Sequence, residues 1–195
     1  MKKGRLKLQD GPDATFRCYS ASQEAQYPGV YKQRKDNLDL LQKFKGDVKK
    51  LTQLLNESLP KKAQIVRFFV AGDTFCNNLM KAQIALAKLH PEIRFYQYTK
   101  SLPLWVNNQQ DFPKNYEMTA SVGGKFDDFI KTYNLKSAEV VYSEQEAKDK
   151  GLEIDHDDTH ACLGTKSFAL LIHGNGQKGS RQAKVHNELI RSMAV

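Results

Sequence analysis

The sequence lacks the long apolar run that a membrane-spanning helix needs. Its best apolar stretches, residues 65–72 and 168–172, have the length of strands, and the first contains Arg67. The basic start of the chain, residues 1–5, is followed by polar residues 9–13 rather than by the apolar core of a secretory signal. We therefore expect a protein that neither spans a membrane nor anchors in one, and that resides in a reducing cytoplasm.

Cysteine is also scarce. The three cysteines, Cys18, Cys76 and Cys162, lie far apart, so no two have the short spacing of a zinc or iron-sulfur loop. Their odd number argues against a disulfide framework. By spacing alone they are ordinary thiols.

An excess of positive charge is absent from most of the chain and is concentrated in its first third. Residues 1–62 hold 14 basic and 7 acidic side chains, whereas the remaining residues hold 16 and 15, within a net charge of +8. Such asymmetry is typical of proteins that bind nucleic acids. The alternative is a solvated, lysine-rich helix face that serves solubility.

What is present is a regular alternation of element types in a chain of 195 residues, a length that predicts one domain. Apolar side chains at helical spacing predict a helix over residues 36–59, with Gly46 as a point at which it could divide in two. Five apolar, β-rich runs follow, at residues 65–71, 93–99, 116–120, 138–142 and 168–172. Helix-favouring stretches lie at residues 77–89, 102–108, 125–133, 144–150 and 180–193.

Alternating strands and helices predict an α/β fold with parallel βα repeats, arranged as a partial, TIM-like barrel or as an open sheet. The expected single domain covers residues 1–195. It consists of a basic, largely helical N-terminal segment, residues 1–62, and five βα units, residues 63–195.

Polar, glycine-rich residues follow every predicted strand. In parallel α/β folds ligands bind at this carboxyl edge, because loops and helix starts converge there. The alternative is that these residues only cap helices and form turns. The candidate ligand-binding residues are Gly72, Asp73, Thr99, Lys100, Ser121, Gly123, Gly124, Ser143, Glu144 and His173.

The densest group of titratable residues lies between the last two predicted strands, in a predicted loop of about 15 residues. Its two imidazoles and interleaved carboxylates are possible ligands of a divalent metal. Such a site would suit a metal-dependent phosphodiester hydrolase. The alternative is a charged loop whose polar groups are satisfied by its own backbone. The residues are Asp155, His156, Asp157, Asp158 and His160.

Several strings also resemble, in order and over nearly the whole chain, the bacteriophage "gene product 88" family. They are residues 16–22, 70–75, 94–103, 119–124, 140–144, 155–158 and 168–174. The resemblance implies a protein similar to radical S-adenosylmethionine proteins, located in the host cytoplasm if phage-encoded. In it, Gly72 and Asp73 would stand at the methionine amino group of the cofactor, and Ser121 and Ser143 near its ribose.

The same resemblance implies a cysteine cluster near the N-terminus whose last cysteine is followed by Tyr or Phe. Cys18, followed by Tyr19, corresponds to that residue, but the upstream cysteines are absent from this chain. Either the chain is shortened or the cluster has been lost. A [4Fe-4S] cluster with one open iron needs three protein thiolates, so we do not expect it on this chain.

The leading functional prediction is thus a phage-derived protein that resembles radical S-adenosylmethionine proteins and has an incomplete cluster site. Two alternatives remain open: the metal-dependent hydrolase, and a non-enzymatic protein that binds nucleic acid or a host protein through the basic first third. Under the leading prediction Asp73, Thr99, Lys100, Ser121, Ser143 and His173 converge on one cavity that takes a nucleoside-type ligand. Cys18 should lie at its rim.

Overall fold

The structure is a computed structural model and describes residues 18–172, 183–184 and 187–188. Its helices are α1 (Tyr19–Gln26), α2 (Pro28–Lys43), α3 (Val48–Glu57), α4 (Asn77–Leu89), α5 (Leu102–Asn107), α6 (Asp128–Thr132), α7 (Glu144–Asp149), α8 (Thr159–Leu163) and a short 3-10 helix, η1 (Gln109–Asp111). The strands are β1 (Ile65–Phe68), β2 (Arg94–Thr99), β3 (Tyr116–Ser121), β4 (Ser137–Val141) and β5 (Phe168–Leu171).

The five strands form one open sheet in the order β1-β2-β3-β4-β5, and every neighbouring pair is parallel. The prediction of an α/β fold with parallel βα repeats is therefore confirmed, in its open form. The strands form where predicted because parallel strands covered on both faces need continuous apolar runs. β1 is shorter than expected, since Phe69 adopts a left-handed backbone with φ of 50° and ends the strand.

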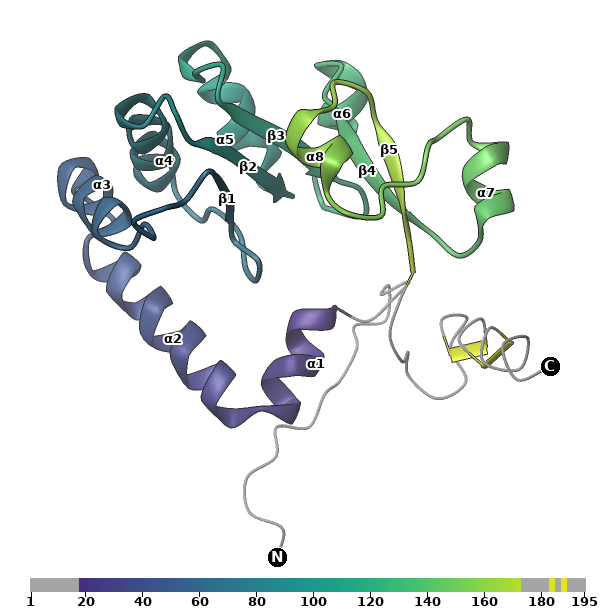
Figure 1. The fold of residues 1–195 in the computed structure, drawn as a ribbon, viewed down its shortest axis with the longest axis horizontal. Helices are drawn as coiled ribbons and strands as arrows, with labels where there is room; N and C mark the ends of the chain where they lie inside the picture. Colours follow the sequence, from purple (N-terminus) through teal and green to yellow (C-terminus); the bar gives the residue numbers. More distant parts are fainter. Residues whose placement is uncertain (1–17, 173–182, 185–186, 189–195) are drawn as a thin grey trace, which may run out of the picture.

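The two faces of the sheet pack against different helices (Figure 1). On one face, Phe68, Phe95 and Met118 contact apolar side chains of α4 and α5. The Phe68 and Phe95 rings stack with their centroids 5.3 Å apart. On the opposite face, Tyr96 and Phe168 pack against α8. This follows from the alternation of side chains along each strand.

The predicted helix over residues 36–59 divides around Gly46, as the sequence allowed, into α2 and α3. They are separated at residues 44–47, and the Asp47 side chain accepts a hydrogen bond from Lys50 N, 3.0 Å, to cap α3. α3 joins the body of the protein, since Leu51 is fully buried against Leu79 and Ala82 of α4. α8, in contrast, lies where the sequence predicted a loop. The helix expected over residues 180–193 lies largely outside the described residues.

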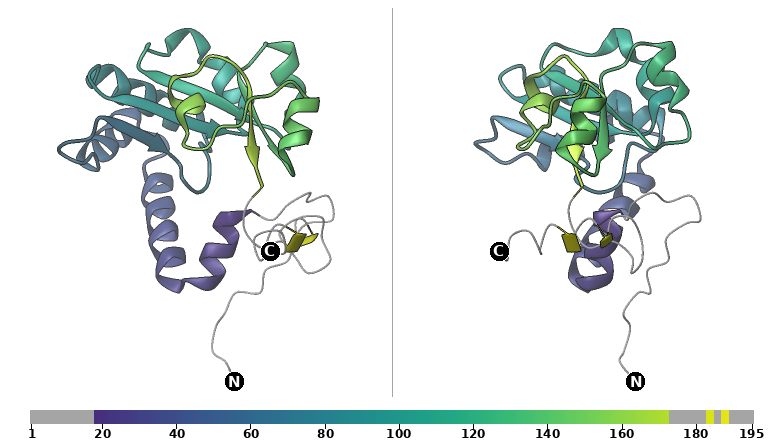
Figure 2. Two further views of the ribbon diagram at one scale, coloured as in Figure 1. Left: turned by 45° about the vertical axis from the view of Figure 1, so that its right-hand side comes forward. Right: turned by 90° about the vertical axis from the view of Figure 1, so that its right-hand side faces the viewer.

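α2 differs from α3 and α4 in that none of its residues is buried. It packs against α1, and together they extend away from the sheet (Figure 2). They also contact the rest of the protein: the Tyr19 hydroxyl of α1 donates to the carbonyl oxygen of Val70, in the loop after β1, and Leu41 of α2 packs against the cluster around Leu51. No helix in the described part of the chain is long and apolar enough to cross a membrane.

Candidate functional site

The carboxyl ends of β1 and β2 are joined through the side chain of Asp73. One carboxylate oxygen accepts from Thr99 Oγ1 at 2.7 Å and from Gln97 Nε2 at 3.2 Å, and also from Thr74 N. The other accepts from the backbone N–H groups of Lys100 and Ser101, at 2.7 and 3.1 Å. Gly72, before it, adopts φ of +81°, which suits glycine. The Asp73 oxygens are thus occupied by donors of the chain itself.

Lys100 connects this group to the loop after β3. Its ammonium donates to the carbonyl oxygens of Ser121 and Val122, at 2.9 and 2.7 Å. Desolvation lowers the pKa of Lys100, and the negative charges of Asp127 and then Asp73 oppose that shift. The structure therefore brings Asp73, Thr99, Lys100 and Ser121 to the same edge of the sheet.

The Gly123–Gly124 turn, which belongs to the candidate ligand-binding residues, holds a carboxylate of the same chain. Asp127 accepts from the backbone N–H of Gly123 at 2.8 Å and of Gly124 at 2.9 Å. Gly123 has φ of +92°, a conformation that side-chain-bearing residues rarely adopt. These N–H groups therefore stabilise the loop, and they are occupied by the chain itself.

The remaining candidate residues do not contact the group formed by Asp73 and Lys100 through any hydrogen bond in the described part of the chain. The Ser143 hydroxyl accepts from Glu146 N at 3.1 Å and caps α7, and Glu144 is an exposed residue in the first turn of that helix. Cys18 is exposed at the start of α1, within electrostatic range of Lys100. His173 lies outside the described residues.

Beside Asp73 lies a buried polar network that the sequence analysis missed. Gln97, on β2, donates to Thr74 and accepts from Gln83 of α4 and from the Tyr116 hydroxyl, at 2.7 to 3.0 Å. All four side chains are buried. The sequence signal was a glutamine among the apolar side chains of each of two segments, β2 and α4. Because every member has a partner, the network specifies how α4 sits on the sheet.

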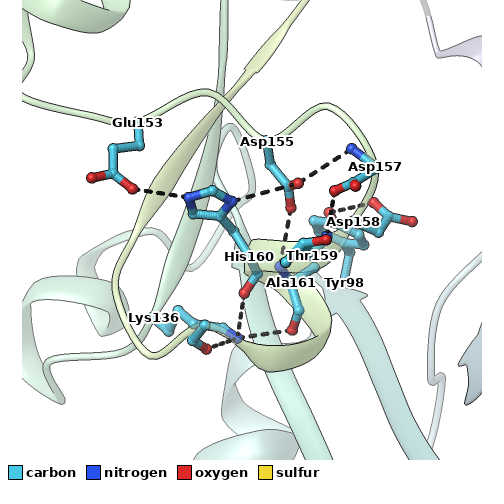
Figure 3. Close-up of polar contacts among 10 residues, drawn as sticks. Tyr98, Lys136, Glu153, Asp155, Asp157, Asp158, Thr159, His160 and Ala161 are labelled. Carbon is cyan, nitrogen blue, oxygen red and sulfur yellow. Dashed lines mark hydrogen bonds and ion pairs between the residues drawn. The ribbon is translucent and has the colours of Figure 1, made fainter.

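The segment with the predicted metal ligands crosses the α8 face of the sheet (Figure 3). Asp155 is buried and accepts from the backbone N–H groups of Asp157 and Ala161, at 3.3 and 3.1 Å. Asp157 in turn accepts from Thr159 N. His160 contacts Glu153 through Nε2 at 3.0 Å and Asp155 through Nδ1 at 3.6 Å.

The other two candidates point elsewhere. Asp158 binds Arg67, Tyr96 and Tyr98 at 2.7 to 2.9 Å, and His156 is exposed. Across the described residues, no group of three or more His, Cys, Asp or Glu side chains is placed to hold a metal ion. The geometry therefore gives the hydrolase hypothesis no support. Asp155 and Asp157 accept from backbone N–H groups of the segment itself, as the alternative of a self-satisfied charged loop expects, whereas Asp158 accepts from side chains of β1 and β2.

The three thiols do not fit an iron-sulfur cluster either. Cys18 precedes α1, Cys76 precedes α4, and Cys162 is buried in α8, where desolvation raises the pKa of its thiol. A cluster needs several thiolates around one position. We therefore derive no chemistry through such a cluster, and binding of S-adenosylmethionine stays a prediction.

Four lysines of the basic first third lie at the junction of α2 and α3. Among α2 cations, Lys32, Lys35 and Arg34 pair with Asp36, Asp39 and Glu24, respectively. We define the α2–α3 lysine surface as Lys43, Lys45, Lys49 and Lys50. In the described part of the chain none of these four has a carboxylate within ion-pair distance, and three are exposed. The Lys43 and Lys50 ammonium groups lie 5.4 and 5.8 Å from the centre of the Phe44 ring.

The fold and these sites define an open, parallel α/β protein with a polar carboxyl edge and a basic helical extension. The sequence model of the gene product 88 family matches residues 13–189, so the chain belongs to this family. The match assigns no activity, and the likeness to radical S-adenosylmethionine proteins gains no support from it. No curated protein and no solved structure matches the chain.

Proposed function

We propose that this member of the gene product 88 family binds nucleic acid through the α2–α3 lysine surface. The observation that carries the proposal is that α2, sixteen residues long, contributes no buried residue to the protein. Most helices in proteins owe their stability to burying an apolar face. A helix that extends beyond the core, next to a group of lysines without acidic partners, suggests a binding surface.

The chemistry of this surface favours a polyanion. Four lysines gather around one turn, and their nearest carboxylate in sequence, Asp47, caps α3. Nucleic-acid phosphates supply a dense row of negative charges to such groups, and counterion release then drives binding. Phe44 lies beneath two of the ammonium groups and keeps them close together.

Exposed aromatic rings on α2 favour single strands over duplexes. Tyr27, at the start of the helix, and Tyr31, one turn later, have 51% and 40% of their surfaces exposed. Bases of a single strand stack on such rings, whereas the bases of a duplex are already stacked. Tyr27→Ala with Tyr31→Ala should therefore weaken binding to a single strand more than binding to a duplex.

The test is the fluorescence anisotropy of labelled oligo(dT) and of a duplex, measured over a range of salt concentrations. We expect the logarithm of affinity to fall linearly with the logarithm of salt, by about 0.7 to 0.9 per phosphate contact. Lys49→Glu with Lys50→Glu should weaken binding and flatten this slope.

The matched control reverses two exposed lysines elsewhere, Lys131→Glu with Lys148→Glu, and so changes the net charge equally. It should retain most of the affinity. Equal losses in both double variants would show only a response to net charge and would contradict the proposal. So would an absence of binding at low salt, and the surface would then have to be assigned to a protein partner.

A further inference from the structure

The sheet face that packs against α8 carries a cluster of hydrogen-bond donors on two neighbouring strands. Arg67 Nη1 of β1 donates to Asp158 at 2.9 Å, and the Tyr96 and Tyr98 hydroxyls of β2 donate at 2.8 and 2.7 Å. The Arg67 guanidinium also lies 4.7 Å from the centre of the Tyr98 ring. Three donors from two strands thus converge on a single carboxylate.

Both phenols are fixed as donors. Burial, reinforced by the hydrogen bond to Asp158, raises the pKa of Tyr96 to about 12, and it raises the pKa of Tyr98 well above the ordinary value. Each hydroxyl therefore keeps its proton at neutral pH and presents it to an acceptor. A guanidinium together with neutral hydroxyl donors is a set that suits an oxyanion.

The cluster also has more donors than Asp158 satisfies. Within the described residues, two buried side-chain polar atoms have no hydrogen-bond partner: Arg67 Nε and Thr119 Oγ1. Both lie on this face, because Thr119 of β3 is the register partner of Tyr98, and Arg67 that of Tyr96. Thr119 is only 1% exposed. A buried polar group without a partner costs free energy and calls for an explanation.

Asp158 reaches the donors from an unfavourable backbone conformation. Its φ of 64° and ψ of 12° lie in the left-handed region, which is uncommon for residues other than glycine. Backbone strain of this kind persists only where surrounding contacts hold it, and it concentrates at binding sites and switches. The carboxylate therefore occupies the donor cluster at a conformational cost.

We propose that Arg67, Tyr96, Tyr98 and Thr119 form a binding site for a small oxyanion, the phosphate or carboxylate group of a ligand, which Asp158 occupies as an internal substitute. A ligand oxyanion displaces the Asp158 carboxylate and releases the strained turn before α8. Its additional oxygens accept from Arg67 Nε and Thr119 Oγ1. This site lies on the α8 face of the sheet and is independent of the α2–α3 lysine surface.

The first experiment removes the internal competitor with Asp158→Ala and titrates the protein with inorganic phosphate, followed by calorimetry. We expect phosphate to bind the variant about tenfold or more tightly than it binds the unaltered protein, which corresponds to about 1.4 kcal/mol. Asp157→Ala, an exposed carboxylate in the same turn, is the matched control and should leave phosphate binding unchanged.

The second experiment tests which groups bind the ion. In the Asp158→Ala background, Arg67→Gln should abolish phosphate binding, and Thr119→Val should weaken it while preserving the side-chain shape. Acetate titrated in parallel distinguishes the two sources of the oxyanion. Tighter binding of phosphate indicates a phosphorylated ligand, and tighter binding of acetate indicates a carboxylate.

A third variant keeps the test decisive where Asp158→Ala does not fold. Asp158→Asn retains the shape of the side chain and removes its charge, and it should show a smaller gain in phosphate affinity. The proposal is overturned if Asp158→Ala and Asp158→Asn, or whichever of the two folds, bind neither phosphate nor acetate more tightly than the unaltered protein does. An equal gain in Asp157→Ala would overturn it as well, because the effect would then reflect net charge.

Discussion

At the scale of single residues, Asp73 shows how one carboxylate holds two strand ends together. Its oxygens accept from two side chains and three backbone N–H groups, contributed by the loop after β1 and by the end of β2. Hydrogen bonds to a charged acceptor are the stronger ones in proteins, and their donors are costly to leave unpaired when buried.

We expect Asp73→Ala to lower the free energy of unfolding by about 3 kcal/mol, because it leaves several part-buried donors without an acceptor. Urea denaturation followed by circular dichroism measures the change. Asp128→Ala, an exposed residue in the first turn of α6, should change stability by less than about 0.5 kcal/mol. A similar small effect for Asp73→Ala would show that the loops rearrange without cost.

The contacts of His160 make the stability of the folded protein depend on pH. Its hydrogen bond to Glu153, followed by the negative charge of Asp155, raises the pKa of His160 in the folded state. A raised folded-state pKa means that the folded protein binds the proton more tightly than the unfolded chain does. The stabilisation is therefore fully present below about pH 6.5, the value of an unperturbed histidine, and is lost as pH rises through the folded-state pKa.

Replacing His160 by Asn should remove this contribution. The melting temperature of the unaltered protein should exceed that of the variant by more at pH 6 than at pH 8, as measured by differential scanning calorimetry. His156→Asn is the control, since that imidazole is exposed in the same segment. A difference between the unaltered protein and His160→Asn that stays constant with pH would contradict the assignment.

At the scale of elements, α8 depends on contacts made far from it in sequence. The Lys136 ammonium, before β4, donates to the carbonyl oxygens of His160, Ala161 and Gly164, at 3.3, 2.9 and 2.8 Å. Carbonyl groups at the end of a helix lack partners within it, and a cation there satisfies them. A helix of five residues is not stable by itself, so Lys136 contributes to its presence.

Lys136→Met keeps the apolar stem and removes the ammonium. We expect a loss of about 2 kcal/mol in unfolding free energy, because buried carbonyl groups lose a charged donor. Amides of residues 159–163 should also exchange with solvent faster, as measured by mass spectrometry. Lys166→Met, at an exposed position, should change neither quantity. Unchanged exchange in Lys136→Met would show that α8 is held by its apolar contacts alone.

The same elements show what the sequence can and cannot predict. The five strands were predictable because buried parallel strands appear as continuous apolar runs, as residues 93–99 do for β2. α8 was not, since its stabilising partners, Lys136 among them, are distant in sequence. The gathering of Asp73 and Lys100 followed from topology. The sequence did not predict that side chains of the protein itself, such as Asp127, would bind the candidate ligand-binding groups. Those contacts depend on side-chain geometry, which a sequence pattern does not contain.

At the scale of the whole molecule, the apolar core is shared unequally between the sheet and the N-terminal helices. α3 is part of the core through Leu51, which is fully buried. α2 lies at its margin: Leu41, in the last turn, packs against the same cluster, whereas Leu38 and Leu40 have 43% and 44% of their surfaces exposed. The two helices are adjacent in sequence, yet α3 contributes a buried residue and α2 contributes none, and α2 extends away from the sheet (Figure 1).

We therefore expect leucine-to-alanine substitutions to destabilise the protein much more in α3 than at the exposed positions of α2. Leu51→Ala should lower the free energy of unfolding by about 3 kcal/mol, because it removes buried methyl groups and leaves a cavity. Leu38→Ala and Leu40→Ala should each cost less than about 0.5 kcal/mol, because exposed side chains away from the core contribute little to stability. Chemical denaturation of the three variants tests this difference. A cost at Leu38 or Leu40 comparable with that at Leu51 would mean that α2 packs against the protein in solution, and its exposed surface would then no longer support a role in binding.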